Sequence, residues 1–332
     1  PVLYIRCPSN LDEEHPMSFF RRVTLAVSTQ LDRMVGEIEN HDAVVEAGIR
    51  ESRRLYARAR VRHAGDQRVS RQRTRHLVML GAVLAGCTGP QVVSQSHRVV
   101  TPRLEQAAAV ASDGYRLPIR RWDGAERPTT LVLGLHGFND YSRALAPLAE
   151  HLRDQGITTY AVDQRGFGAT AQFGRWHGAP RMAQDLRELI ALLRARHPGT
   201  RLLVVGESMG GAVAMLAAAQ GPLDIDGLVL IAPAVWSRDS MPWYQRLALS
   251  AAVRTVPWLR LTGDGLPIRP TDNPAELRAM SEDPLVIKGT RVDALWGVTE
   301  LMDAARGQVL GRGQPVLLLY GRHDQIIEYL LS

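Results

Sequence analysis

Apolar and polar positions in residues 100–332 follow two alternating spacings, which predicts strands and helices in turn. Continuous apolar runs typical of buried strands cover residues 129–137, 158–166, 201–208, 226–235 and 315–321, after an early strand or hairpin at 112–122. Helical spacing covers residues 143–156, 182–199 and 210–221. Because the strands are apolar throughout and are separated by helices, we expect an α/β fold with a mostly parallel, doubly wound sheet.

Residues 17–64 show a different pattern. They contain no proline and carry apolar side chains at helical spacing, from Phe20 and Val23 to Met34, which predicts a helical segment. MSFFRR, followed by VGEIENHDAVVEAGIRESRR, resembles the opening of the phage shock protein A family of peripheral membrane proteins. A solvated amphipathic helix without a separate function is the alternative interpretation.

Residues 69–87 have the pattern of a secretion signal. Three arginines at positions 71, 73 and 75 precede a short apolar run, and Leu84-Ala85-Gly86-Cys87 is similar to the lipobox of bacterial lipoproteins. The resemblance implies that the Cys87 thiol is acylated and that the lipid anchors the protein to a membrane of the bacterial cell envelope. A short buried helix or strand is the alternative, and the protein would be cytoplasmic if the signal is not used.

These patterns divide the chain into segments. Because a signal peptide stands at the start of a protein, we expect translation to begin at Val69, with the helical extension 1–68 belonging to an upstream or fused reading frame and to no part of the native protein. Residues 69–87 are then the signal peptide, 88–111 a linker and 112–332 the α/β domain.

Composition excludes several classes of protein. With 45% apolar and 22% charged residues among 332, the chain is not a disordered one, and it has no apolar run of about 20 residues that would span a bilayer. The net charge of +6 is concentrated in residues 1–87, with 14 arginines against 10 acidic residues, so we predict no nucleic-acid partner for the α/β domain. Cys7 and Cys87 are too few for a disulfide scaffold or a zinc site.

A nucleophile motif lies between a predicted strand and a predicted helix. Gly206-Glu207-Ser208-Met209-Gly210 fits the pattern G-x-S-x-G, in which glycines permit a sharp turn that projects the serine hydroxyl. We therefore predict that Ser208 is a catalytic nucleophile, with Gly206 and Gly210 supporting the turn.

Four motifs in order resemble the α/β-hydrolase superfamily, in particular its monoacylglycerol lipase and lysophospholipase-like branch. They are HGFNDYS at 136–142, DQRGFG at 163–168, GESMGG at 206–211 and YGRHDQII at 320–327, and the resemblance spans residues 112–332. It implies that the backbone N–H groups of Phe138 and Met209 form an oxyanion hole and that Asp324 is the catalytic acid. His136 and Gly137 then have a structural role in their loop.

The resemblance also implies a catalytic histidine that follows the acid. No histidine follows Asp324 in these 332 residues, and His323, His177 and His151 match no triad position. We expect the base beyond Ser332, and little or no esterase activity for this chain expressed alone.

Residues 236–312 break the α/β alternation and correspond to the helical cap of the family. The resemblance implies that the cap forms an apolar tunnel for an acyl chain. Tryptophan, methionine and other apolar side chains in the segment could line the tunnel or fill an ordinary core: Trp236, Met241, Trp243, Tyr244, Leu247, Trp258 and Trp296.

The predicted function is a serine ester hydrolase that acts on monoacylglycerols, lysophospholipids or related esters at a membrane and needs no metal or organic cofactor. An acyltransferase or a peptidase on the same fold is the first alternative. The second is a membrane-associated scaffold protein that uses residues 17–64, with an inert hydrolase domain.

Overall fold

The computed structural model describes residues 2–7, 90–94, 96, 98–235, 238, 241–262, 273–308 and 315–321. The predicted helix within residues 17–64, the signal with Cys87, the cap residue Trp236 and the predicted acid Asp324 lie outside the described residues.

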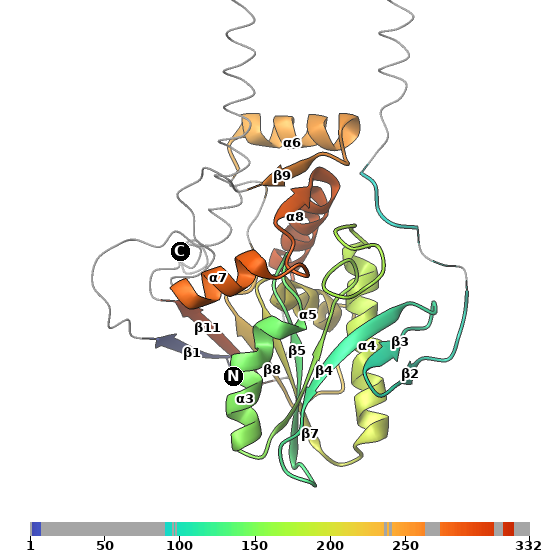
Figure 1. Ribbon diagram of the computed structural model, residues 1–332, viewed down its shortest axis with the longest axis vertical. Helices are drawn as coiled ribbons and strands as arrows, with labels where there is room; N and C mark the ends of the chain where they lie inside the picture. Colours follow the sequence, from blue (N-terminus) through green and yellow to red (C-terminus); the bar gives the residue numbers. More distant parts are fainter. Residues whose placement is uncertain are drawn as a thin grey trace, which may run out of the picture.

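The main sheet follows the predicted α/β pattern. In the described part of the chain it has nine strands in the order β1-β11-β8-β7-β5-β6-β4-β3-β2 (Figure 1). The strands are β1 (Val2–Cys7), β2 (Arg103–Leu104), β3 (Ala108–Val110), β4 (Arg116–Trp122), β5 (Thr130–Leu135), β6 (Thr158–Val162), β7 (Arg201–Glu207), β8 (Gly227–Ile231) and β11 (Val316–Gly321). From β1 to β6 in this order all neighbours are parallel, and β4, β3 and β2 add an antiparallel edge. The predicted fold class is therefore confirmed.

Helices cover both faces of the sheet. η1 (Ser142–Leu145) and α3 (Ala146–Asp154) lie on one face, and α4 (Ala179–Arg196) and α5 (Met209–Ala219) lie on the other (Figure 1). α4 begins with Pro180 in its first turn and buries Met182, Leu186, Leu189 and Leu193, which recur at helical spacing. α5 consists almost entirely of small and apolar residues, so it can pack closely between the sheet and its neighbours.

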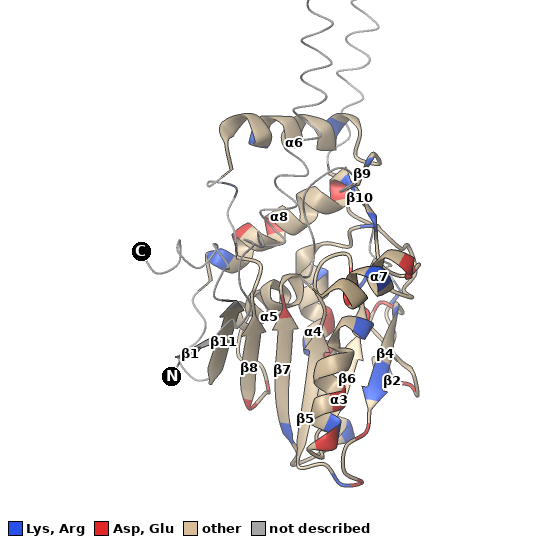
Figure 2. Cartoon of the chain, turned by 60° about the vertical axis from the view of Figure 1, so that its left-hand side comes forward, with Lys and Arg blue, Asp and Glu red and all other residues tan. Residues whose placement is uncertain are grey.

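The cap lies above the carboxyl ends of the parallel strands. It contains α6 (Trp243–Thr255), α7 (Pro274–Glu282), α8 (Val292–Arg306) and a two-stranded antiparallel sheet of β9 (Arg260–Thr262) and β10 (Gly289–Arg291). Figure 2 shows α8 next to the sheet and α6 as the outermost helix. The carboxyl edge of the sheet, where the predicted nucleophile lies, is therefore covered.

The sheet begins earlier in the chain than predicted. β2 and β3 lie within residues 88–111, which we expected to be a linker, and β3 pairs with both β2 and β4. Ala108, Ala109 and Val110 are all buried. The strand was missed because two of its three residues are alanines, which carry little apolar periodicity and low strand propensity.

The first strand of the chain was also not predicted. Val2–Cys7 lies within the predicted helical extension 1–68, yet its backbone pairs in parallel with β11 over six residues. The helix was predicted from the apolar spacing of residues 17–64, which lie outside the described residues, and β1 stands ahead of that segment. Whether residues 1–68 belong to the native protein stays a prediction.

Aromatic residues of the cap lie where neither interpretation placed them. Trp243, Leu247 and Trp258 are 70%, 63% and 57% exposed, and Tyr244 is exposed as well, so these four neither line a tunnel nor fill a core. They occupy the outer side of α6 and the turn that follows it, whereas Met241 is buried and Trp296 is partly buried. Among the described residues, no helix combines the length and the apolar content needed to cross a membrane.

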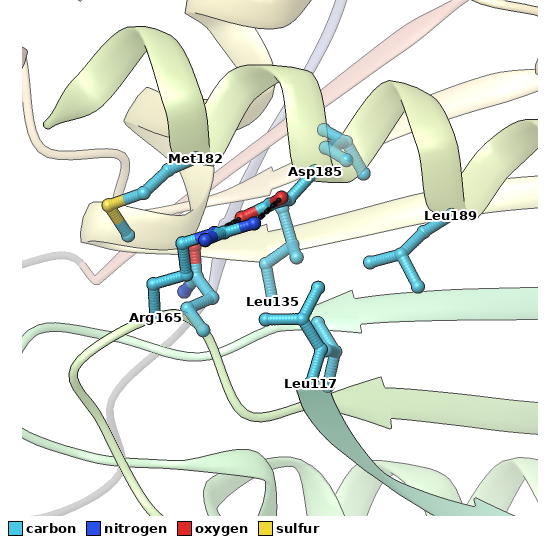
Figure 3. Close-up of a pocket in the computed structure, with 9 residues that line it drawn as sticks. Leu117, Leu135, Arg165, Met182, Asp185 and Leu189 are labelled. Carbon is cyan, nitrogen blue, oxygen red and sulfur yellow. Dashed lines mark hydrogen bonds and ion pairs between the residues drawn. The ribbon is translucent and has the colours of Figure 1, made fainter. Parts of the chain in front are cut away.

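A buried ionic cluster joins the DQRGFG motif to α4. Arg165 donates to the carboxylates of Asp113 and Asp185, and Arg181 donates to those of Asp185 and Glu188. The Arg165–Asp185 pair borders a pocket between the sheet and α4 that is otherwise lined mainly by leucines (Figure 3). No predicted catalytic residue lines this pocket, so we assign the cluster a structural role.

Candidate active site

Ser208 joins β7 to α5 in a strained backbone conformation. Its φ angle is +48°, in the left-handed region that residues with a side chain seldom adopt. The neighbouring glycines make this turn possible, since a Cβ atom added to Gly210 would lie 2.4 Å from the carbonyl oxygen of Leu135. A Cβ added to Gly206 would lie 2.7 Å from the carbonyl oxygen of Gly210. The predicted strand, turn and helix around the nucleophile motif are all present.

The loop after β5 lies beside Ser208. Leu135 at the end of β5 pairs in register with Gly206 near the end of β7, so the two chains leave the sheet at the same edge. We call residues 136–143 the oxyanion loop. A Cβ added to Gly137 would lie 3.5 Å from the Cβ of Ser208, which places the start of this loop against the nucleophile.

Three polar groups of the site have no hydrogen-bond partner in the described part of the chain. The Ser208 hydroxyl is buried and unpaired. The backbone N–H groups of Phe138 and Met209 also meet no acceptor there, although both residues are buried. Met209 is the first residue of α5, where a helix leaves its N–H groups unsatisfied. Because buried N–H groups are nearly always paired, two free ones beside a free hydroxyl indicate a place for a ligand oxygen.

His136 is fully buried, and both of its ring nitrogens are occupied. Nδ1 lies 2.7 Å from the carbonyl oxygen of Gly137, and Nε2 accepts a hydrogen bond from the Gln164 N–H at 3.0 Å. This arrangement fits the neutral ring with its proton on Nδ1. Burial lowers the pKa of His136 to about 4, opposed in part by the Gly137 carbonyl. The ring therefore fixes the oxyanion loop to the loop after β6 and has no nitrogen available for a proton transfer.

Of the other histidines weighed from the sequence, His177 and His151 lie in the described part of the chain, and neither forms a hydrogen bond with Ser208. His177 is buried against the ring of Tyr115, and its pKa is lowered to about 4 by burial and by the charge of Arg165. His151 is exposed on α3. His323 lies outside the described residues, as does Asp324, so the predicted acid and base both stay predictions.

Two carboxyl groups near the nucleophile were not singled out from the sequence. Burial raises the pKa of Glu207 to about 7, and the charge of Asp140 adds to the shift. Burial likewise raises the pKa of Asp140 to about 6, although the Tyr141 N–H and Arg143 oppose it. Glu207 stands between Gly206 and Ser208 in the motif, which was the one signal that could have pointed to it. In the described part of the chain, its side chain has no hydrogen bond or ion pair.

No group of three or more histidine, cysteine, aspartate or glutamate side chains in the described residues is arranged to hold a metal ion.

Comparison with known proteins places the chain among hydrolases. The family model described as "Serine aminopeptidase, S33" matches residues 126–332. The monoacylglycerol lipase of Mycolicibacterium smegmatis is 26% identical over 227 residues, which are 64% of this chain and 77% of the lipase. Human monoglyceride lipase is 28% identical over 233 residues, 66% of this chain and 73% of the relative.

A solved structure shares the fold. A soluble variant of monoglyceride lipase from Saccharomyces cerevisiae, in complex with a substrate analogue, superposes with a TM-score of 0.52 at 18% identity, over 71% of this chain and 81% of that one. On the extent of the family match, this chain belongs to the α/β-hydrolase family described as serine aminopeptidase, S33.

Proposed function

We propose that the protein is a serine hydrolase that cleaves carboxylic esters of lipid-like substrates. The observation that carries the proposal is the buried, unpaired Ser208 hydroxyl on a strained turn, beside the unpaired N–H groups of Phe138 and Met209. An ester carbonyl placed there would present its carbon to Ser208 and its oxygen to the two N–H groups.

In the proposed reaction, Ser208 Oγ forms a bond to the acyl carbon while its proton passes to a histidine. The negative charge on the former carbonyl oxygen is held by the N–H groups of Phe138 and Met209. The bond between the acyl carbon and the alcohol oxygen then breaks, and the alcohol leaves with the proton from the histidine. Water releases the acid from the acyl-enzyme by the same steps, and Asp324 is proposed to orient the histidine.

Monoacylglycerols and lysophospholipid-like esters are the proposed substrates. The names of the M. smegmatis and human relatives support a monoacylglycerol as the ester. The family description names a serine aminopeptidase, which supports a peptidase as the second candidate. Both reactions need the same nucleophile and oxyanion donors, so only the substrate separates them.

The test is turnover of a monoacylglycerol, a lysophospholipid and an aminoacyl anilide by the product of the whole gene. We expect ester cleavage that Ser208→Ala lowers by at least about a thousandfold. Ser281→Ala is the matched control, since this exposed hydroxyl donates only to the Arg278 carbonyl within α7. Faster cleavage of the anilide would favour the peptidase, and ester cleavage unaffected by Ser208→Ala would overturn the proposal.

The predicted base is tested by a second comparison. The 332-residue chain and the product of the whole gene are assayed on the same ester. Little turnover by the former and full turnover by the latter is expected if the histidine follows Ser332. Substantial turnover by the 332-residue chain that Ser208→Ala abolishes would contradict this prediction.

We further propose that the protein works at a bacterial membrane, attached through acylated Cys87. The outer side of α6 and the turn after it support contact with lipid, since Trp243 and Leu247 are exposed on the helix and Trp258 is exposed in the turn. Residues 241–262 carry three arginines and no acidic residue, which suits an anionic lipid surface, and the ribbon of α6 in Figure 2 has blue positions and no red ones.

Vesicle binding separates the modes of attachment. Cys87→Ser protein should still bind vesicles containing phosphatidylglycerol more strongly than vesicles of phosphatidylcholine alone, and Trp243→Ser with Leu247→Ser should weaken that binding about tenfold or more. Loss of binding on deletion of residues 17–64, with no effect of the α6 substitutions, would favour the scaffold alternative.

A further inference from the structure

The oxyanion loop is hydrogen-bonded to a part of the cap that is far from it in sequence. We call residues 273–291, which hold α7 and β10, the cap arm. The Ile287 N–H donates to the carbonyl oxygen of Asn139 at 2.9 Å, and Asn139 Nδ2 donates to the hydroxyl of Thr290 at 2.6 Å. The backbone and the side chain of Asn139 are thus both bonded to the cap arm.

Two further side chains of the loop contact the same arm. The Tyr141 hydroxyl donates to the Asp283 carboxylate at 2.7 Å. Arg143 lies between two acids of the arm, with Nη2 at 2.9 Å from Glu276 and Nε at 3.5 Å from Asp283. Four residues of the cap arm therefore bond to three of the oxyanion loop.

At Phe138 and Asn139 the oxyanion loop belongs to no helix or strand. Phe138, whose N–H is the proposed oxyanion donor, immediately precedes Asn139, and Asn139 has a φ angle of +66°. Asparagine tolerates this left-handed conformation better than most residues do. The Phe138 N–H lies in the peptide plane between Gly137 and Phe138, and the carbonyl oxygen of that plane is held by His136 Nδ1 at 2.7 Å. Fixing Asn139 on the other side of Phe138 limits the two backbone torsions of Phe138 through which this plane could turn.

A second contact reaches the loop from another part of the cap. The Phe138 ring packs edge-on against Phe167 and Trp176. The Trp176 indole fills the space above Gly297 of α8, where an added Cβ would lie 2.2 Å from its Nε1. The Phe138 side chain thus rests on an apolar support that leads to the cap, but this support fixes the ring more than the peptide bond.

We propose that Asn139 and Thr290 are positioning residues, and that the bond between them holds the Phe138 N–H in the direction that oxyanion stabilisation requires. The cap arm is then part of the catalytic apparatus and does more than cover the site. An oxyanion donor is effective only when it is already oriented toward the developing charge, so a loosened loop lowers the rate of the chemical step. This inference rests on the proposed ester hydrolase function.

The experiment is steady-state kinetics on a soluble short-chain ester with the product of the whole gene. Thr290→Val removes the hydroxyl and keeps the shape of a side chain that is almost fully buried. We expect kcat to fall about tenfold or more, since a small misplacement of a catalytic group costs up to about a hundredfold. KM should change less than about twofold, because substrate binding and the fold are preserved.

Three variants complete the design. Thr290→Ser restores the hydroxyl and should restore kcat. Thr299→Val is the matched control, since this buried hydroxyl of α8 donates only to the Leu295 carbonyl within its own helix, and its kcat should stay near that of the wild type. Asn139→Gly keeps the left-handed backbone but loses the amide, so it tests the same bond if Thr290→Val does not fold.

The outcomes separate the two proposals. If Ser208→Ala abolishes turnover but Thr290→Val and Asn139→Gly keep the kcat of the wild type, the positioning role is wrong and the proposed function stands. Equal losses of kcat in Thr290→Val and Thr299→Val, each with a lower melting temperature, would also contradict the positioning role. They would mean that the hydrogen bond between Asn139 and Thr290 only stabilises the fold. Turnover that survives Ser208→Ala would overturn the proposed function itself.

Discussion

Two groups of acids in the described part of this protein differ in whether an arginine forms an ion pair with their carboxylates. In the ionic cluster beside α4, Arg165 and Arg181 contact every carboxylate. Burial alone would raise the pKa values of Asp113 and Glu188, but the hydrogen bonds they accept, together with the arginine charges, lower both. Near Ser208, burial raises the pKa values of Asp140 and Glu207 to about 6 and about 7.

The difference indicates what each group is for. A buried carboxylate with charged donors is satisfied and holds elements together, as Asp185 holds the DQRGFG loop to α4. Burial raises the pKa of Asp185, and the hydrogen bonds and charges of Arg165 and Arg181 oppose this shift. Unpaired carboxyl groups that titrate near neutral pH are costly to a fold and are found most often at functional sites. The unpaired carboxyl group in this protein is that of Glu207, which directly precedes the candidate nucleophile Ser208.

The largest expected effect comes from removing the partner of the paired acids. Arg165→Met leaves Asp113 and Asp185 without their shared donor in a site where these side chains are almost fully buried. We expect the free energy of unfolding at pH 7 to fall by about 3 to 5 kcal/mol. Urea denaturation measures it, and a loss below about 1 kcal/mol would mean that the cluster is not a stabilising element.

The next effect concerns the carboxyl group of Glu207 and depends on pH. Glu207 has a pKa of about 7 in the fold against an ordinary value of 4.5, so the folded protein holds its proton more tightly than the unfolded chain does. Its contribution to stability is complete below pH 4.5, is lost as the pH rises to about 7, and is constant above that. Glu207→Gln should remove this decline. Between pH 4.5 and pH 8, the free energy of unfolding of the variant should therefore fall by less than that of the wild type, the difference being at most about 3 kcal/mol.

Chemical denaturation of both proteins across pH 4 to 8 measures the effect. The Arg165→Met protein serves as the contrast, since it should retain the decline due to Glu207. The same decline in the Glu207→Gln variant and the wild type would show that this carboxyl titrates normally.

A smaller effect is expected from the neighbour of Glu207. The charge of Asp140 raises the pKa of Glu207, so Asp140→Asn should lower that pKa while burial keeps it above 4.5. The pH at which stability stops declining should therefore move below 7. Carbon-detected NMR titration of the Glu207 carboxyl gives the value directly, and an unchanged pKa would remove Asp140 from this pair.

The smallest effect is expected for a pair at the surface. Arg103 and Glu105 form an ion pair at 3.0 Å, but the arginine side chain is 58% exposed. Arg103→Met should change the free energy of unfolding by less than about 1 kcal/mol, because water and salt screen the pair. A loss comparable with that of Arg165→Met would mean that burial does not distinguish the two sites.

Much of the body of the hydrolase could be predicted from the sequence. The strands at 129–137, 158–166 and 201–208 correspond to β5, β6 and β7, and the glycines of the nucleophile motif stand where added side chains would clash. Both predictions rest on local requirements. A buried parallel strand must be apolar, and a sharp turn between a strand and a helix must leave room for the backbone.

Predictions failed or were absent where the decisive contact is distant in sequence. The exposed side of α6 could not be predicted, because Trp243 and Leu247 are as apolar as core residues and only the packing of α8 beneath the helix decides which side faces out. Strands β2 and β3 were missed because pairing with β4 makes strands of residues whose own preference is weak.

The sequence by itself determined the fold class, the strand and helix on either side of the nucleophile motif and the position of the candidate nucleophile, because periodicity and glycine spacing act over a few residues. Only the tertiary structure decided that Asn139 forms a hydrogen bond with Thr290, 151 positions away in the chain. It also decided that burial raises the pKa of Glu207 and that Arg165 forms ion pairs with both Asp113 and Asp185. Hydrogen bonding and desolvation depend on which atoms the packed fold brings together, and no local pattern records that.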